Sequence, residues 1–225
     1  MSKYLKELER LFIQAAKPQN SVGMKAYMLN QFDFFGIKTP ERDAIVKPFL
    51  KSNPLSSHKE LSEIVLKMWS FKEREWQYAA IDVFRYHHSL WELNSIDLIE
   101  SCLTKKSWWD TVDGIGSDWI PNYFSLYPKQ IIPITEQWNQ SDNIWLQRSS
   151  ILFQRSFKSK TDTRLLKKYI LNHKNAKEFF VQKAIGWALR EYSKTDPDWV
   201  INFVAKNKIA PLSKREAIKR IIVNN

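Results

Sequence analysis

The strongest constraint on this chain is an internal repeat of helical segments. LQRSSILFQR at 146–155 aligns with VQKAIGWALR at 181–190 at an offset of 35 residues. WQYAAIDVFR at 76–85 aligns with the first of these at twice that offset, with Gln and Arg in the same columns. The intermediate copy falls on SWWDTVDGIG at 107–116. Repeats of this length that hold two helices are typical of α-solenoids, in which stacked pairs bury one another's apolar faces.

Apolar residues recur at three- and four-residue steps along most of the chain, which predicts amphipathic helices. The helices are short and are joined by brief polar links such as KSKTD and KTDPD. Asp162, Asp196 and Ser213 are predicted N-caps, and Pro121 and Pro133 are expected to kink or end the helical stretches that contain them. No segment shows the sustained alternation typical of a strand, and no Gly/Ser linker divides the chain. We therefore predict an all-α fold: a single domain over residues 1–225, built as a right-handed superhelix of HEAT-like helical repeats.

The composition excludes several protein classes. Cys102 is the only cysteine, so no internal disulfide forms and a reducing compartment is expected. The start MSKYLKELERLF has the pattern of a charged amphipathic helix and not of a signal peptide. No apolar run approaches the roughly 20 residues that span a bilayer. We expect a cytoplasmic monomer, associated with the nucleoid when on DNA and without membrane contact.

The positive charge is concentrated in the last third of the chain. Residues 1–146 hold 17 basic and 18 acidic residues, whereas residues 147–225 hold 18 basic and 6 acidic. A charge that serves only solubility has no reason to be so uneven. A polyanion partner gives one, because Lys and Arg release counterions when they neutralise phosphates. We therefore expect nucleic acid in a concave basic groove; the alternative is a solvated basic face that binds nothing.

One column of the repeat combines unusual residue types. It reads Asp113, Arg148 and Lys183 in three successive repeats, and Trp109 and Trp187 lie four residues away on the same faces. Burial of an isolated ion is very costly, so a core would not accept three unpaired charges there. These five residues should therefore line one surface. The alternative is that Asp113 only forms a structural salt bridge with Arg148 between repeats.

Indole faces and a carboxylate in a groove that binds a polyanion suit cleavage of an N-glycosidic bond. This cleavage develops positive charge on the sugar, which aromatic faces attract and a carboxylate stabilises. A second carboxyl group normally protonates the leaving group. A purine alkylated at N3 or N7 already carries positive charge, so one carboxylate is enough. The residues alone do not favour this reaction over plain DNA binding.

Other familiar sites are missing from the sequence. It has no GxxxxGK[ST] phosphate loop, no GxSxG motif and no histidine pattern that suggests zinc. Asp110, Asp113 and Asp118 have no spacing that favours a metal. GIKTPER at 36–42, a turn leading into a helix with Pro40 at its start, is a weak phosphate-binding signal.

At these residues the chain resembles the AlkD-like family of DNA alkylation repair glycosylases, which are HEAT-like repeat proteins. The resemblance covers nearly the whole chain. Its most specific segments are FFGIKTPER (34–42), KKSWWDTVD (105–113), SDNIWLQRSSILFQ (141–154), KEFFVQKAIGWALREYSKT (177–195) and APLSKREAIK (210–219). It implies a monofunctional glycosylase of base excision repair that removes positively charged N3- or N7-alkylated purines from double-stranded DNA. It also implies that the base is not extruded into a pocket and that no metal or organic cofactor is needed.

The resemblance assigns roles to single residues. Asp113 takes the position of the catalytic carboxylate. Trp109 and Trp187 take those of two indoles that pack against the sugar-phosphate backbone of the lesion. Arg148 takes a position in the same cleft that contacts the backbone, and Lys183 joins it as a DNA-binding cation through its place in the column.

The N-terminal part is expected to approach the DNA as well. The resemblance places Tyr27, Lys38 and Thr39 against the duplex. Two positions depart from the family pattern, because Leu29 stands where Lys is expected and Lys38 where Gln is expected. Both changes concern substrate detail. A DNA-binding solenoid without catalysis and a protein scaffold remain the alternatives, and the sequence does not decide whether Glu41 or Asp110 assists catalysis.

Overall fold

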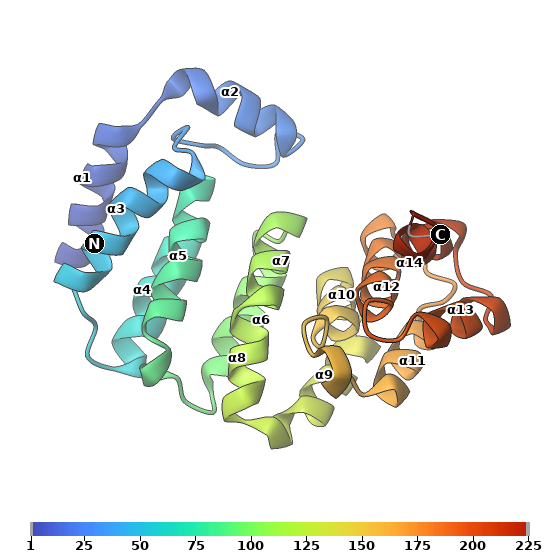
Figure 1. Cartoon of the computed structure of the whole chain (residues 1–225). Coiled ribbons are helices and arrows are strands. Elements are labelled where there is room, and N and C mark those ends of the chain that lie inside the picture. Colours follow the sequence, from blue (N-terminus) through green and yellow to red (C-terminus); the bar gives the residue numbers. More distant parts are fainter. Residues whose placement is uncertain (1, 224–225) are drawn as a thin grey trace. The chain divides into compact units, whose positions relative to one another are not determined.

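A computed structural model of the chain describes residues 2–223, with side chains up to residue 221, and its regular elements are helices (Figure 1). Within residues 2–223 the only extended pairing is one isolated bridge between Asp33 and Glu73. No helix in this range is long and apolar enough to cross a membrane. The predicted all-α fold of helical repeats is confirmed, while the handedness of the superhelix and its concave groove stay predictions.

The chain divides into two compact units, which we call the first unit (residues 1–98) and the second unit (residues 99–225). The prediction of a single domain stays untested by this division. The helices of the first unit are α1 (Lys3–Ala15), α2 (Pro18–Tyr27), α3 (Thr39–Ser52), α4 (His58–Ser70) and α5 (Arg74–Tyr86), and α6 (Ser95–Thr104) crosses the boundary. Those of the second unit are α7 (Trp109–Ser117), α8 (Trp119–Leu126), α9 (Ile131–Gln140), α10 (Ile144–Leu152), α11 (Thr163–Asn172), α12 (Phe179–Tyr192), α13 (Pro197–Lys206) and α14 (Pro211–Val223).

The repeat inferred from the sequence is visible in where helices begin. Helices α3, α5, α7, α10 and α12 start at positions 39, 74, 109, 144 and 179, each 35 residues after the one before. The periodicity therefore extends one copy further toward the N-terminus than the aligned segments indicated. Each of these helices is the second of a pair in its repeat, so equivalent positions on them have equivalent surroundings.

The glutamine column of the repeat has a structural role. Nε2 of Gln77 donates to three backbone carbonyls at the end of α4, at 3.0–3.2 Å. Nε2 of Gln147 donates to the carbonyl that follows α9 at 2.7 Å. Nε2 of Gln182 donates at 2.9 Å to a carbonyl in the link after α11. Each glutamine thus donates to backbone carbonyls at or just beyond the C-terminal end of the preceding helix, so the column has the same structural role in three repeats.

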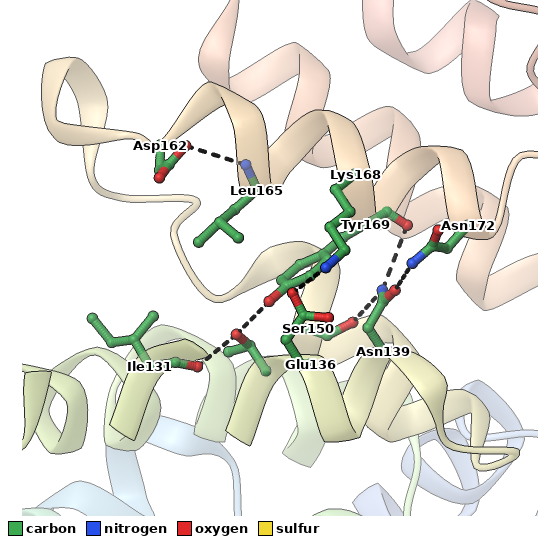
Figure 2. Close-up of polar contacts among 10 residues, drawn as sticks. Ile131, Glu136, Asn139, Ser150, Asp162, Leu165, Lys168, Tyr169 and Asn172 are labelled. Carbon is green, nitrogen blue, oxygen red and sulfur yellow. Dashed lines mark hydrogen bonds and ion pairs between the residues drawn. The ribbon is translucent and has the colours of Figure 1, made fainter. Parts of the chain in front are cut away.

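Helices α9 and α11 of the second unit are joined by a buried polar cluster (Figure 2). The hydroxyl groups of Thr135 and Tyr169 are 2.7 Å apart, and Nδ2 of Asn172 donates to Oδ1 of Asn139 at 2.7 Å. Asp162 accepts from the first amides of α11, which confirms its predicted role as an N-cap. The cluster fixes the register of one helix against the other, because buried polar groups need specific partners.

The two other predicted N-caps, Asp196 and Ser213, had different outcomes. Asp196 caps α13 as expected, with its carboxylate accepting from the amide of Trp199 at 2.8 Å. Ser213 does not cap a helix, because α14 already begins at residue 211 and the Ser213 hydroxyl donates to the carbonyl of Gln182 at 2.8 Å.

Pro121 and Pro133 are the third residues of α8 and α9, where a missing amide breaks no helical hydrogen bond.

Gly186 lets α14 pack closely against α12. A Cβ atom at this position would lie 2.5 Å from the Cβ of Glu216 and 3.1 Å from the carbonyl of Ser213. No side chain larger than hydrogen fits there without a shift of the helices. The close approach brings Glu216 over the exposed side of α12, where it takes part in the site described next.

Candidate functional site

A paired carboxylate and guanidinium connect three helices of the second unit. Arg148 on α10 donates from Nε to Oδ1 and from Nη2 to Oδ2 of Asp113 on α7, each at 2.9 Å. Its Nη1 donates to the carbonyl of Phe180 on α12 at 2.8 Å. The Arg148 side chain is 1% exposed and that of Asp113 is 17% exposed. The salt bridge between repeats therefore exists, and its negative end is the one that reaches solvent.

Burial and pairing act on this pair in opposite directions. Burial raises the pKa of the Asp113 carboxyl group above its ordinary value, and the charge and hydrogen bonds of Arg148 oppose that rise. Burial likewise lowers the pKa of Arg148, against the effect of Asp113. A bidentate charge-assisted pair is a strong one, so we expect both groups to be ionised at neutral pH. Protonation of Asp113 would leave Arg148 buried without a counter-charge.

Three cations border the indole of Trp187 on α12. Cζ of Arg148 lies 5.0 Å from the ring centroid, Nζ of Lys183 lies 5.4 Å from it, and Cζ of Arg190 lies 5.8 Å from it. These distances are typical of cation–π interactions. The Nε1 of Trp187 is buried and has no acceptor among the described residues. Trp187 therefore packs on the ion pair and on the basic side of α12 together.

Glu216 on α14 is a functional-site neighbour that the sequence argument did not single out. Its carboxylate pairs with Lys183 at 3.1 Å and with Arg190 at 2.7 Å. Partial burial would raise its pKa, but the hydrogen bond and charge of Lys183 and the charge of Arg190 lower it overall. The signal for it was present, because Glu216 is the only acidic residue in positions 199–225.

The structure places the predicted second-unit residues as follows. Asp113, Arg148, Lys183 and Trp187 are connected by the contacts above. Trp109 is the first residue of α7, one helical turn before Asp113, and is half-buried. Each guanidinium nitrogen of Arg148 donates within the protein, which places Arg148 to orient the Asp113 carboxylate. Its contact to a DNA backbone stays a prediction.

A small depression gives access to this carboxylate. Its walls come from α7 and α10 and the turn that follows α10: Val112, Asp113, Gly116, Arg148, Ser149, Leu152 and Arg155. Arg155 also contributes positive charge that lowers the pKa of Asp113. Within residues 2–221, no group of three or more His, Cys, Asp or Glu side chains is arranged to hold a metal ion.

In the first unit, a buried carboxylate holds the GIKTPER turn. Glu75, which is 0% exposed, accepts from the amides of Phe35 at 3.1 Å, Gly36 at 2.9 Å and Ile37 at 3.0 Å. Gly36 has a φ of 88°, and a Cβ there would lie 2.1 Å from the carbonyl of Lys17. The turn thus requires glycine and a carboxylate acceptor, and together they fix where α3 begins.

The predicted first-unit residues surround the start of α3. Tyr27 is 70% exposed, and Lys38 and Thr39 are exposed. The amide of Lys38 donates to the Glu41 carboxylate at 3.2 Å, in a capping arrangement. Tyr27 and Thr39 line one pocket of about 330 Å³, whereas Lys38 does not belong to it.

Comparisons with known proteins show the family of the chain. A family model described as "DNA alkylation repair enzyme" matches residues 8–221. A solved structure described as "Predicted DNA alkylation repair enzyme from Enterococcus faecalis" is 34% identical, with a TM-score of 0.85 over 91% of this chain and 95% of that one. The structure of smu.31 from Streptococcus mutans UA159 is 17% identical, with a TM-score of 0.61 over 80% of this chain and 91% of that one, and shows a likeness of fold alone. A search among curated proteins found no match.

Proposed function

Because this chain belongs to the family of DNA alkylation repair enzymes, we propose that it is a monofunctional DNA glycosylase that hydrolyses the N-glycosidic bond of positively charged N3- or N7-alkylated purines in double-stranded DNA. The observation that carries the proposal is the Asp113–Arg148 pair, whose carboxylate end is partly exposed and borders a small depression while its guanidinium end is buried. Trp187 packs directly on this pair.

The geometry supplies a fixed negative charge where the reaction develops a positive one. Departure of a cationic purine leaves positive charge on the sugar ring. Asp113 would stabilise that charge or align the attacking water, and electrostatic stabilisation of this kind works best when the groups are already oriented. Arg148 provides the orientation, because its two donors hold both carboxylate oxygens. No second carboxyl group is required, since the alkylated base leaves without protonation.

The charge distribution supports DNA as the partner. The second unit holds 21 basic and 12 acidic residues, against 14 basic and 12 acidic residues in the first unit. Lys183 is 22% exposed and lies beside Trp187, so it remains the proposed phosphate contact in this region. Tyr27, Lys38 and Thr39 remain proposed DNA contacts of the first unit, and Trp109 a proposed contact beside the lesion.

The deciding experiment is a base-release assay. Duplex DNA treated with a methylating agent is incubated with the full chain, and free 7-methylguanine and 3-methyladenine are measured. We expect release by the wild type and a loss of roughly 100-fold or more in Asp113→Asn, with DNA binding retained. Asp142→Asn, an exposed acid in the link before α10, is the matched control and should release bases at the wild-type rate. Undiminished release by Asp113→Asn contradicts the catalytic assignment.

A DNA-binding solenoid without catalysis is the second candidate function, and the commitment of both Asp113 oxygens to Arg148 is the observation that favours it. It predicts tight, salt-dependent binding and no base release after long incubation. Under either function, Lys183→Ala should weaken binding and reduce the salt slope by about one unit. Equal loss of affinity in Lys183→Ala and Asp113→Asn would mean that the acid is structural.

We also propose that the enzyme acts as a cytoplasmic monomer, on the nucleoid when bound to DNA, without metal or organic cofactor. Base release should therefore be the same with and without EDTA. Sedimentation of the active fraction at the mass of one chain tests the oligomeric state.

A further inference from the structure

Arg42 on α3 is a largely buried residue whose guanidinium forms no ion pair with the described residues. Arg42 is 9% exposed, and its Nε is buried without a hydrogen-bond partner among the described residues. The neighbouring carboxylates do not serve it, because Glu41 pairs with Lys17 and Asp43 pairs with Lys47. A donor buried without an acceptor, like this Nε, costs free energy, and the rest of the guanidinium lines a pocket. An external acceptor at this point would therefore be favoured.

The repeat shows that this position is unusual. Arg42 lies 35 residues before Gln77 and so occupies the column of Gln77, Gln147 and Gln182. The side-chain amide of each of those glutamines donates to carbonyls at or just beyond the end of the preceding helix. Arg42 makes no such bond with residues 2–221, and its guanidinium instead lies 4.8 Å from the ring centroid of Tyr78. Arg42 thus places a side-chain donor in the glutamine column, as the other repeats do, but this donor has no backbone acceptor among the described residues.

The Arg42 side chain lines the first-unit pocket of about 330 Å³. This volume falls in the range of small-molecule sites, about 300–1,000 Å³. Tyr27 and Tyr78 contribute aromatic rings, and Thr39 contributes a hydroxyl group at the start of α3. The remaining walls are glycine and apolar side chains: Gly23, Met24, Met28, Phe34 and Ile37.

We propose that this pocket binds an unpaired nucleobase. Aromatic side chains stack on the face of any base, and the flat guanidinium offers its donors to acceptors on the edge of a base. A free phosphate fits less well, because it would lose its hydration against apolar walls. The inference goes beyond the glycosylase proposal and does not depend on it: Tyr27 and Thr39 are also proposed DNA contacts, but the pocket contains no residue proposed to act in base release and its ligand need not be alkylated.

Gly23 provides a way to close the pocket without altering Arg42. It lies on α2 at the pocket wall, and a Cβ built there meets no atom within 4 Å. A leucine at position 23 therefore has room to extend into the pocket, and replacement of a helical glycine does not disfavour α2. Val22, the preceding residue of the same helix, is 73% exposed and is not part of the pocket wall. Val22→Leu is thus the matched control.

The test is a titration of the full chain with deoxyguanosine monophosphate, 2-deoxyribose 5-phosphate and inorganic phosphate, followed by calorimetry and ligand-observed NMR. We expect the nucleotide to bind and both base-free ligands to bind at least about tenfold more weakly. Gly23→Leu and Arg42→Met should each lower the affinity for the nucleotide by about tenfold or more, while Val22→Leu leaves it unchanged. If Arg42→Met does not fold, Gly23→Leu decides the question.

Three results would overturn the proposal: no binding of the nucleotide at millimolar concentration, equal binding of inorganic phosphate, or wild-type affinity in Gly23→Leu. The assay contains no alkylated DNA. A failure of base release therefore leaves this result unaffected, and a failure here leaves the glycosylase proposal unaffected.

Discussion

The two units use the same 35-residue spacing but satisfy their buried carboxylates in different ways. In the first unit, Glu75 is 0% exposed and accepts three backbone amides of the turn before α3. In the second unit, Asp113 is partly exposed and accepts from the Arg148 side chain. A carboxylate held by backbone amides fixes a loop, whereas one held by a buried side chain at a surface is available for chemistry.

The column that contains Asp113 shows the same contrast. Tyr78 of α5 lies 35 residues before Asp113 and is its counterpart in the first unit. Beside Tyr78 the first unit has a pocket with Arg42, and beside Asp113 the second unit has a depression with Arg148. The repeat thus determines where a side chain projects, and the residue type at each copy determines what the surface can bind.

The largest effect is expected from removal of the buried guanidinium. Arg148→Met should destabilise the second unit by about 3–5 kcal/mol, because it leaves Asp113 partly buried without its partner. Hydrogen exchange of amides in residues 99–225 measures the loss unit by unit. The double variant Asp113→Asn with Arg148→Met should recover about 1–3 kcal/mol of it. If the double variant is no better than the single one, the pair is not the reason for the loss.

A somewhat smaller loss should follow a change of the first-unit carboxylate. Glu75→Gln should cost about 2 kcal/mol, since hydrogen bonds to a charged acceptor are worth about 1.5–3 kcal/mol and one amide would face an NH₂ group. Exchange of the Phe35, Gly36 and Ile37 amides should accelerate, and the second unit should be unaffected. Glu63→Gln, at an exposed position of α4, is the control. Equal protection of the three amides in Glu75→Gln and Glu63→Gln would remove the contrast between the units.

The close contact between α12 and α14 should be disturbed by a single added methyl group. Gly186→Ala places a Cβ 2.5 Å from the Cβ of Glu216 and should cost about 1–3 kcal/mol by overpacking. Gly116→Ala, where a Cβ meets nothing within 4 Å, should instead gain up to about 1 kcal/mol. Thermal unfolding of both variants provides the measurement. A gain in stability in Gly186→Ala equal to that in Gly116→Ala would show that the α12–α14 contact does not exclude a Cβ atom.

The smallest effect concerns the pH dependence of the first unit. Hydrogen bonds from Lys25 and then from Lys72 lower the pKa of Asp33 to about 2. A lowered acid pKa gives stability that is present above the unfolded pKa of about 3.9 and is lost as the pH falls toward 2. Because Asp33 is 31% exposed, this contribution should be no more than about 1 kcal/mol.

Denaturant titrations of the wild type and Asp33→Asn between pH 5 and pH 2 test this contribution. The wild type should lose more stability over that interval than the variant, and 1 M salt should shrink the difference because exposed charges are screened. Parallel curves for the two proteins would show that Asp33 contributes nothing to the acid response.

Local sequence patterns determined the repeat and the helices. Apolar spacing predicted the all-α fold. The recurring glutamines marked copies 35 residues apart, and in the structure each of them binds carbonyls at or just beyond the end of the helix before it. The same register predicted that Asp113, Arg148, Lys183 and Trp187 belong to one region, since equivalent positions in stacked repeats are neighbours.

Tertiary structure alone decided which partners these side chains take. The sequence left open whether Asp113 pairs with Arg148, and only the approach of α10 to α7 shows both carboxylate oxygens engaged. Glu216 reaches Lys183 and Arg190 because Gly186 lets α14 approach α12. The Nε of Arg42 is buried without an acceptor among the described residues, because the neighbouring carboxylates pair elsewhere. Periodicity fixes which face of a helix a residue occupies, whereas burial and hydrogen bonding depend on distances between segments that are far apart along the chain.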